Sequence, residues 1–369
     1  MRKDGIQRNS GLELARIICM FFIVLHHYAV HGGYPEVTYD TISIGYVFIQ
    51  IIGMFGRSAC TIFALISAFF LIDSSGKNHY RRMIPLLGQM VLYSAIIGVV
   101  LYCVQPFPVS VGDMLESIFP IKSGNWYVLY YCIFYVFVPF INKGLRALDQ
   151  SQHKKLVIVT VIVWSVIPTL TDKAWSFGPI LFFLASYIIG AYIKLYVYGK
   201  TKRKNTFYLW TALSVAALII VSVVTLNALS YVLHANRWIH AATYFMEYNT
   251  LPALAFSVFF FLYFANVKWQ NKTVNAIASH TLGVYLIHDH FLMRRVLWEV
   301  ISPNASYMTA PYLHILIKVL AVFAVCFLIE WVRHHTFGKR LERWFFTHCD
   351  GWLEKLKNRF TNKKEQKSE

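Results

Sequence analysis

The chain is a succession of long apolar runs separated by short polar stretches. A run of about 17–25 apolar residues can cross a hydrocarbon core of about 30 Å as a helix. The pattern therefore predicts an all-α fold, a polytopic integral membrane helical bundle of about ten transmembrane helices. We place these spans, each to within a few residues, at 12–32, 44–72, 84–104, 126–142, 156–170, 177–197, 207–230, 250–266, 277–297 and 311–333.

The second apolar stretch is too long for one upright span. From Ile42 to Ile72 it would measure about 46 Å as a single helix. We therefore expect it either to tilt or to break at Gly53 or Gly56. Residues 109–118, between the third and fourth spans, read as a short amphipathic helix outside the membrane.

Composition agrees with a membrane protein, and the charges orient it. The 369 residues are 57% hydrophobic and only 14% charged, whereas ordinary soluble domains carry about 25% charged residues. Lys and Arg gather in alternate loops, around 77–82, 143–155, 200–204 and 268–272. Cytoplasmic loops carry this excess, so both termini are expected in the cytoplasm. The bias and a basic tail account for the net charge of +17 without a nucleic-acid partner.

The last residues, 338–369, alternate apolar and basic positions. This pattern predicts a basic amphipathic cytoplasmic tail that lies on anionic membrane lipid. We therefore divide the chain into a membrane domain, 1–337, and this tail, and expect no second catalytic domain. The six cysteines include no Cys-x-x-Cys pair, and we interpret them as small apolar residues.

The first span carries Glu13, Arg16, His26 and His27. A central Arg costs about 2.5–3.5 kcal/mol on insertion, so such residues face a protein interior or a water-filled cavity. Arg16 and His27 are eleven residues apart, three turns plus roughly 20°, and share one helix face. Glu13 can pair with Arg16 at the i,i+3 spacing. His26 points about 100° away from that face.

Two later residues reach a similar depth. Counting along the helices places His27 and Arg57 about 22 Å deep and His288 roughly 17 Å deep. Alternatively, Arg57 snorkels to the outer interface, and His288 simply bonds a neighbouring carbonyl. Asp289 and His290 are expected on other faces than His288, so we predict no metal site there, and no zinc-motif spacing occurs.

On the first span, Glu13 is followed three positions later by Arg16 and, after ten further residues, by His27. This pattern resembles the first helix of the membrane acyltransferase-3 family. This family contains bacterial integral membrane proteins that resemble surface-glycan O-acetyltransferases. Partial matches follow in the family's order: Ser67 after a Phe-rich segment, with Ala68 in place of Gly; Arg82-x-x-Pro85, with His79 where the family has Arg; Trp126 and Tyr127, with Asn125 in place of His; and Tyr285-Leu-Ile-His288.

The resemblance implies that 1–337 is a transmembrane acyltransferase-like domain. It would move an acetyl or other short acyl group from cytoplasmic acyl-CoA to an extracytoplasmic polysaccharide or lipid-linked glycan precursor, across the plasma membrane. Acetyl-CoA would be a donor substrate, and no permanently bound cofactor is expected. Lys77, Arg81 and Arg82 would hold the coenzyme A phosphates. Alternatively, these residues only obey the positive-inside rule.

The resemblance also suggests roles within the membrane. His27 would act as general base on a sugar hydroxyl or as a transient acyl carrier, and an imidazole suits either role near neutral pH. The Glu13–Arg16 pair would line the donor channel, and Arg57 or His288 would stabilise the oxyanion. The alternative function is a transporter or flippase of a glycolipid or small solute, because proton-coupled pathways also use buried Arg, His and Glu.

Overall fold

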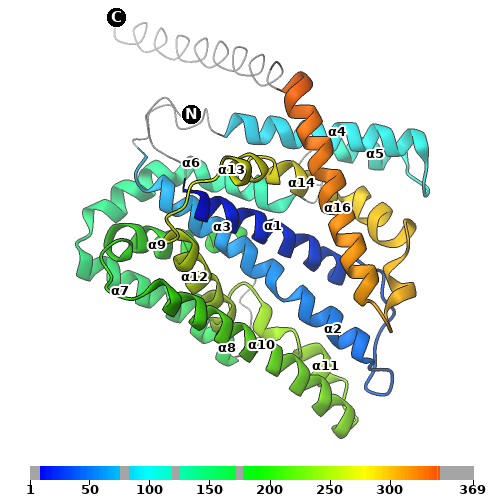
Figure 1. The fold of residues 1–369 in the computed structure, drawn as a ribbon, viewed down its shortest axis with the longest axis horizontal. Coiled ribbons are helices and arrows are strands. Elements are labelled where there is room, and N and C mark those ends of the chain that lie inside the picture. Colours follow the sequence, from blue (N-terminus) through cyan, green and yellow to red (C-terminus); the bar gives the residue numbers. More distant parts are fainter. Residues whose placement is uncertain (1–8, 75–82, 119–124, 172–177, 339, 341–369) are drawn as a thin grey trace, which may run out of the picture.

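The computed structural model of the chain describes residues 9–74, 83–118, 125–171, 178–338 and 340. Every regular element within these ranges is a helix, as the apolar pattern predicts (Figure 1). Nine helical segments of the described chain are long and apolar enough to cross a membrane. The protein is thus an all-α, multi-pass helical bundle. Lys77, Arg81, Arg82 and the tail from residue 341 lie outside the described residues.

The helices follow the predicted spans closely, apart from the ninth. They are α1 (Ser10–Val30), α2 (Ile44–Gly53), α3 (Phe55–Leu71), α4 (Ile84–Val104), α6 (Trp126–Ala147), α7 (Gln150–Val161), α8 (Ile167–Thr171), α9 (Pro179–Tyr192), α10 (Asn205–Leu233), α11 (Arg237–Ala241), α12 (Leu251–Ala265) and α16 (Tyr312–Arg333). The short helix expected at 109–118 is α5 (Val111–Ile118), which packs against α4.

The long second stretch breaks where its glycines predict. α2 ends at Gly53 and α3 begins at Phe55. Gly56 faces α1 so closely that a Cβ there would overlap the side chain of His26. His26 Nδ1 in turn donates to the Gly53 carbonyl at 2.7 Å. Glycine is therefore needed at this point because α1 and the broken helix approach each other directly.

The ninth span, predicted as one helix over 277–297, is instead three short helices. α13 (Lys272–Ala278), α14 (Thr281–His288) and α15 (Phe291–Arg295) follow each other with changes of direction between them. At the second break His290 Nδ1 accepts a hydrogen bond from the Leu292 amide at 3.3 Å and so caps α15. A side chain that satisfies an exposed amide at a helix start stabilises the break.

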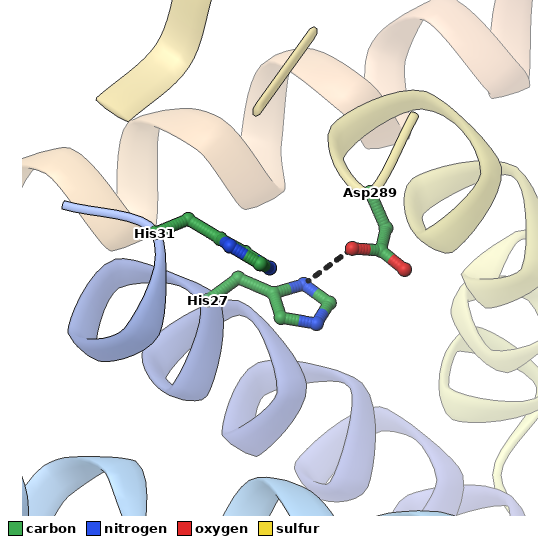
Figure 2. Close-up of side chains that lie close together, drawn as sticks. All are labelled: His27, His31 and Asp289. Atoms are coloured by element: carbon green, nitrogen blue, oxygen red, sulfur yellow. Dashed lines mark ion pairs between the residues drawn. The ribbon is translucent and has the colours of Figure 1, made fainter. Parts of the chain in front are cut away.

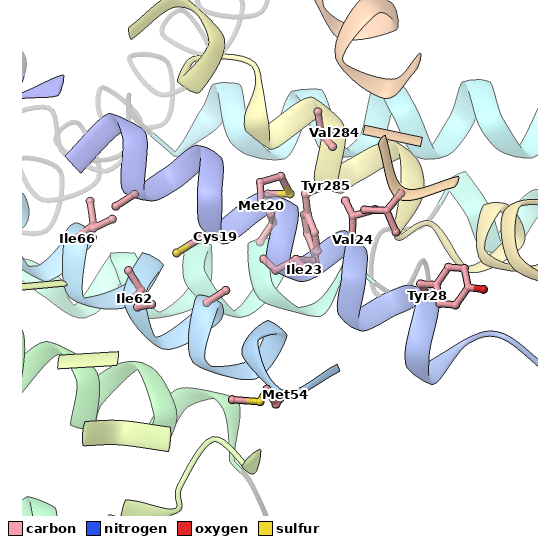
Figure 3. Close-up of a cluster of buried hydrophobic side chains, with 14 of the residues drawn as sticks. Cys19, Met20, Ile23, Val24, Tyr28, Met54, Ile62, Ile66, Val284 and Tyr285 are labelled. Carbon is pink, nitrogen blue, oxygen red and sulfur yellow. The ribbon is translucent and has the colours of Figure 1, made fainter. Parts of the chain in front are cut away.

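Helix α1 lies at the centre of the bundle. It packs most extensively on α3 and also contacts α2, α12, α13, α14 and α16. Figure 3 shows Met20 and Ile23 of α1 beside Tyr285 of α14, and Cys19 of α1 on the side of Ile62 of α3, all of them buried. By contrast, α10 exposes large apolar side chains such as Leu218, as a lipid-facing helix does. The polar residues of α1 are therefore surrounded by protein.

Candidate functional site

The first half of α1 carries the expected ion pair. Arg16 Nη1 lies 3.4 Å from Glu13 Oε2, and both side chains are partly buried, with 34% and 13% of their surface exposed. The i,i+3 spacing places them one turn apart on the same helix face. The pair neutralises a cation that would otherwise be costly inside the membrane.

Further along α1, His27 meets the junction between α14 and α15. His27 Nδ1 lies 3.0 Å from Nε2 of His288, which is fully buried. The same His27 nitrogen lies 3.3 Å from Oδ1 of Asp289, of which only 1% is exposed. The similar depths counted from the sequence thus correspond to a direct contact between His27 and His288.

The hydrogen bonds define which nitrogens carry protons. His288 Nδ1 lies 2.6 Å from the Val284 carbonyl oxygen, and a carbonyl can only accept. The neutral His288 ring therefore donates from Nδ1, and its Nε2 is an acceptor. His27 Nδ1, which faces this acceptor and the Asp289 carboxylate, then carries the proton of a neutral His27. The remaining nitrogen of His27, Nε2, keeps its lone pair for chemistry.

Asp289 is balanced by a second group, the guanidinium of Arg294. Arg294 Nε and Nη2 each lie 2.8 Å from Asp289 Oδ1. A buried carboxylate is tolerated only when it is paired and hydrogen-bonded. Asp289 therefore links His27 on α1 to Arg294 on α15.

The expectation that Asp289 points to another face than His288 is wrong. It assumed that the helix continues, with about 100° between successive side chains. The helix ends at His288, and Asp289 is its C-cap with non-helical backbone angles. Sequence analysis consequently missed both Asp289 and Arg294. The sequence signal that could have revealed Asp289 is its position in an apolar run, directly after the Tyr285-x-x-His288 match.

A third imidazole completes the surroundings of His27. The ring of His31 lies 5.2 Å from that of His27, centroid to centroid, and both face Asp289 (Figure 2). Ligand atoms of His27, His31 and Asp289 lie within 4.8 Å of one another, and two imidazoles with a carboxylate suit a divalent transition metal. The two hydrogen bonds from the Arg294 guanidinium already balance the charge of the Asp289 carboxylate. A metal cation beside this carboxylate would be repelled by the guanidinium. The geometry fits a histidine–carboxylate pair better than a metal centre.

Arg57 lies near His26 of α1. Its guanidinium forms an ion pair with Glu247, in the segment before α12, and lies 5.8 Å from the ring centre of Tyr248. It shares this region with His26 rather than with His27. Among the described contacts, Arg57 therefore pairs with Glu247 and Tyr248 and not with His27 or His288.

Among the described residues, two cavities that border α1 matter for the site. The first, of about 370 Å³, is lined mainly by apolar and aromatic side chains together with Arg16, Cys60 and Ser67. The second, of about 510 Å³, is lined by His26, Arg57 and further polar residues. Along α1, Ile23 of the first cavity is one turn from His26 of the second, and on α3 Cys60 is one turn from Arg57.

Comparison with known proteins agrees with this arrangement. A family model of the acyltransferase-3 family, described as an acyltransferase domain, matches residues 9–331. Neither the curated proteins nor the solved structures contain a match. The match covers α1, both cavities and the junction that carries His288 and Asp289. The chain therefore belongs to the acyltransferase-3 family of membrane acyltransferases.

Proposed function

We propose that the protein transfers an acetyl or other short acyl group from cytoplasmic acyl-CoA to a hydroxyl group of an extracytoplasmic polysaccharide or lipid-linked glycan precursor, in the plasma membrane. The observation that carries this proposal is the fixed position of His27, whose Nδ1 faces both His288 Nε2 and Asp289 Oδ1. An imidazole held in this way presents Nε2 as a base, as a histidine–aspartate pair does in hydrolases.

The first cavity suits the acyl donor. Its lining runs from Arg16 past apolar residues such as Met20 and Phe63 to Cys60 and Tyr285. A thin, mostly apolar pantetheine arm with its acyl group matches such a lining, while Arg16 stands at the end nearer the N-terminus. The charge distribution favours a cytoplasmic position for that end, and acyl-CoA is found in the cytoplasm. The coenzyme A phosphates would then remain outside the cavity, near the basic loop of Lys77, Arg81 and Arg82.

The chemical step is a direct acyl transfer. His27 Nε2 removes the proton of the sugar hydroxyl as its oxygen attacks the thioester carbonyl carbon. The new C–O bond forms and the C–S bond breaks. The protonated His27 then donates its proton to the coenzyme A sulfur, which leaves as the thiol. Base catalysis of this kind is worth about 10²–10⁴-fold in rate.

The neighbours of His27 support that step. The Asp289 carboxylate stabilises the imidazolium that forms on His27, and Arg294 holds the carboxylate in place. His288, which donates to the Val284 carbonyl, orients His27 as an acceptor. This tautomer favours an orienting role for His288 over the oxyanion-stabilising role suggested by its depth alone.

The test uses the purified full-length protein, radiolabelled acetyl-CoA and the producing cell's own surface glycan. We expect label on the glycan with the wild type and about 10²–10⁴-fold less with His27→Ala. His335→Ala, which removes an exposed imidazole just after the end of α16, serves as the matched control and is expected to transfer at the wild-type rate. Equal transfer by wild type and His27→Ala would exclude His27 as the base. No transfer with any acyl-CoA would overturn the proposed function.

A further inference from the structure

The second cavity contains a set of polar side chains that the acyl-transfer step does not use. It is enclosed by α1, the segment 33–37, α2, the start of α3 and the α11 region. Its polar lining residues are His26, Tyr34, Glu36, Tyr46, Gln50, Arg57, His240 and Thr243. We propose that this cavity binds the sugar unit that presents the acceptor hydroxyl, and that it selects uncharged sugars. The inference rests on the proposed function and adds the acceptor site to it.

The position of the cavity favours an acceptor. It lies one helical turn beyond the first cavity, both on α1 and on α3. His26 lines it, and His26 is the neighbour of His27 in the chain; their ring centroids are 5.7 Å apart. The lining residues Pro35, Glu36 and His240 are exposed at its rim. A molecule entering at this rim reaches His26, the chain neighbour of His27.

The size and chemistry of the cavity suit a sugar. Its volume of about 510 Å³ lies within the range of about 300–1,000 Å³ typical of small-molecule sites. Sugars offer hydroxyl groups together with apolar ring faces, and the lining offers amide, imidazole and hydroxyl groups beside the rings of Tyr34 and Tyr46. The first cavity, in which apolar side chains predominate, lacks this density of polar partners.

Several lining residues of the cavity are held in place by hydrogen bonds. Asn227 of α10 donates to Gln50 Oε1 at 2.6 Å. His26 Nδ1 is bonded to the Gly53 carbonyl, and Tyr34 donates to the Tyr28 carbonyl at 3.2 Å. Side chains fixed before a ligand arrives lose less conformational entropy when it binds, so the site is preorganised.

The charges argue for an uncharged acceptor. Among the described lining residues the one Lys or Arg is Arg57, and its charge is balanced by Glu247. Glu36 adds a carboxylate at the rim. A uronate or a sugar phosphate would need an unpaired cation to offset its desolvation. The described lining therefore discriminates against anionic sugars, because the Glu36 carboxylate repels them and the Arg57 cation is already paired with Glu247.

The experiment measures transfer kinetics of the full-length protein in lipid vesicles with acetyl-CoA. The acceptor probes are oligosaccharides released from the producing cell's surface glycan and separated into uncharged and acidic fractions. Two rim variants, His240→Ala and Glu36→Gln, are compared with matched controls outside the lining, His234→Ala and Asp40→Asn. We expect each rim variant to raise the KM for the uncharged oligosaccharides about tenfold, with the KM for acetyl-CoA unchanged, and each control to behave as wild type.

The outcomes separate the two proposals. If the wild type transfers the acetyl group and both rim variants keep the wild-type KM for the acceptor, the acceptor site is overturned and the proposed function stands. Transfer confined to the acidic fraction would overturn the selection of uncharged sugars. If the rim variants raised the KM for acetyl-CoA instead, the cavity would belong to the donor. No transfer by wild type would overturn the proposed function and the acceptor site with it.

Discussion

His27 Nδ1 and His288 Nε2 lie 3.0 Å apart, although 261 positions separate the two residues along the chain. The contact joins the central helix α1 to α14, the middle piece of a broken span. The break directly after His288 lets Asp289 reach the same nitrogen of His27. The site therefore depends on a helix that ends inside the bundle.

The carboxylate of Asp289 is expected to support the base rather than to bind substrate. Asp289→Asn keeps the size of the side chain but removes the charge that stabilises a protonated His27. We expect kcat to fall by up to about 10⁴-fold while the KM for acetyl-CoA stays the same, because only the transition state carries the imidazolium. Steady-state kinetics of the purified protein measures this. An unchanged kcat would show that Asp289 acts only through packing.

Arg294 is expected to stabilise the fold through Asp289. Arg294→Gln leaves the buried Asp289 carboxylate without its cationic partner, a change that typically costs about 3–5 kcal/mol. Arg295→Gln is the matched control, because Arg295 is 53% exposed and lies 3.9 Å from Glu299, and exposed pairs contribute about 0–1 kcal/mol. Thermal unfolding in detergent should show a much lower Tm for Arg294→Gln than for Arg295→Gln. Similar Tm values would contradict a buried Arg294–Asp289 pair.

The close approach of α1 and α3 can be tested at Gly56. Gly56→Ala would drive a methyl group into His26, so overpacking should cost about 1–3 kcal/mol. Gly88→Ala on α4 meets nothing within 4 Å and should leave stability unchanged or slightly higher. Tm values of the two variants, measured side by side, check this. A Gly56→Ala protein as stable as Gly88→Ala would place His26 elsewhere.

Metal removal distinguishes the two interpretations of His27, His31 and Asp289. Because Arg294 already balances Asp289, we expect acyl transfer to continue at the wild-type rate after treatment with a chelator. The assay is transfer of labelled acetyl groups before and after extended dialysis against EDTA. Loss of activity that added Zn²⁺ restores would instead identify these three residues as a metal site.

Much of the fold follows from the sequence because membrane helices are specified by long apolar runs. The pairing of Glu13 with Arg16 follows from helix geometry. Depth counted along the helices places His288 near the level of His27 but does not by itself predict their contact. The break near Gly53 also follows, since the stretch exceeds the thickness of the membrane.

The rest depends on irregular backbone and on distant partners. Asp289 reaches His27 only because α14 ends one residue earlier, and periodicity gives no warning of that end. Arg57 pairs with Glu247, which lies in a segment between α11 and α12 whose course is set by tertiary packing. The basic loop with Lys77, Arg81 and Arg82 lies outside the described residues, so its part in donor binding stays a prediction.

The central claim is that acyl groups pass from one side of the membrane to an acceptor on the other with His27 as the base. The most direct measurement uses sealed, inside-out membrane vesicles of the producing cell, with labelled acetyl-CoA added outside. Because the vesicles are inverted, the added donor faces the cytoplasmic surface, and the glycan lies in the lumen. Labelled glycan in the lumen with wild type, and none with His27→Ala at equal expression, is the expected result. Lumenal glycan labelled equally by both proteins would contradict the account.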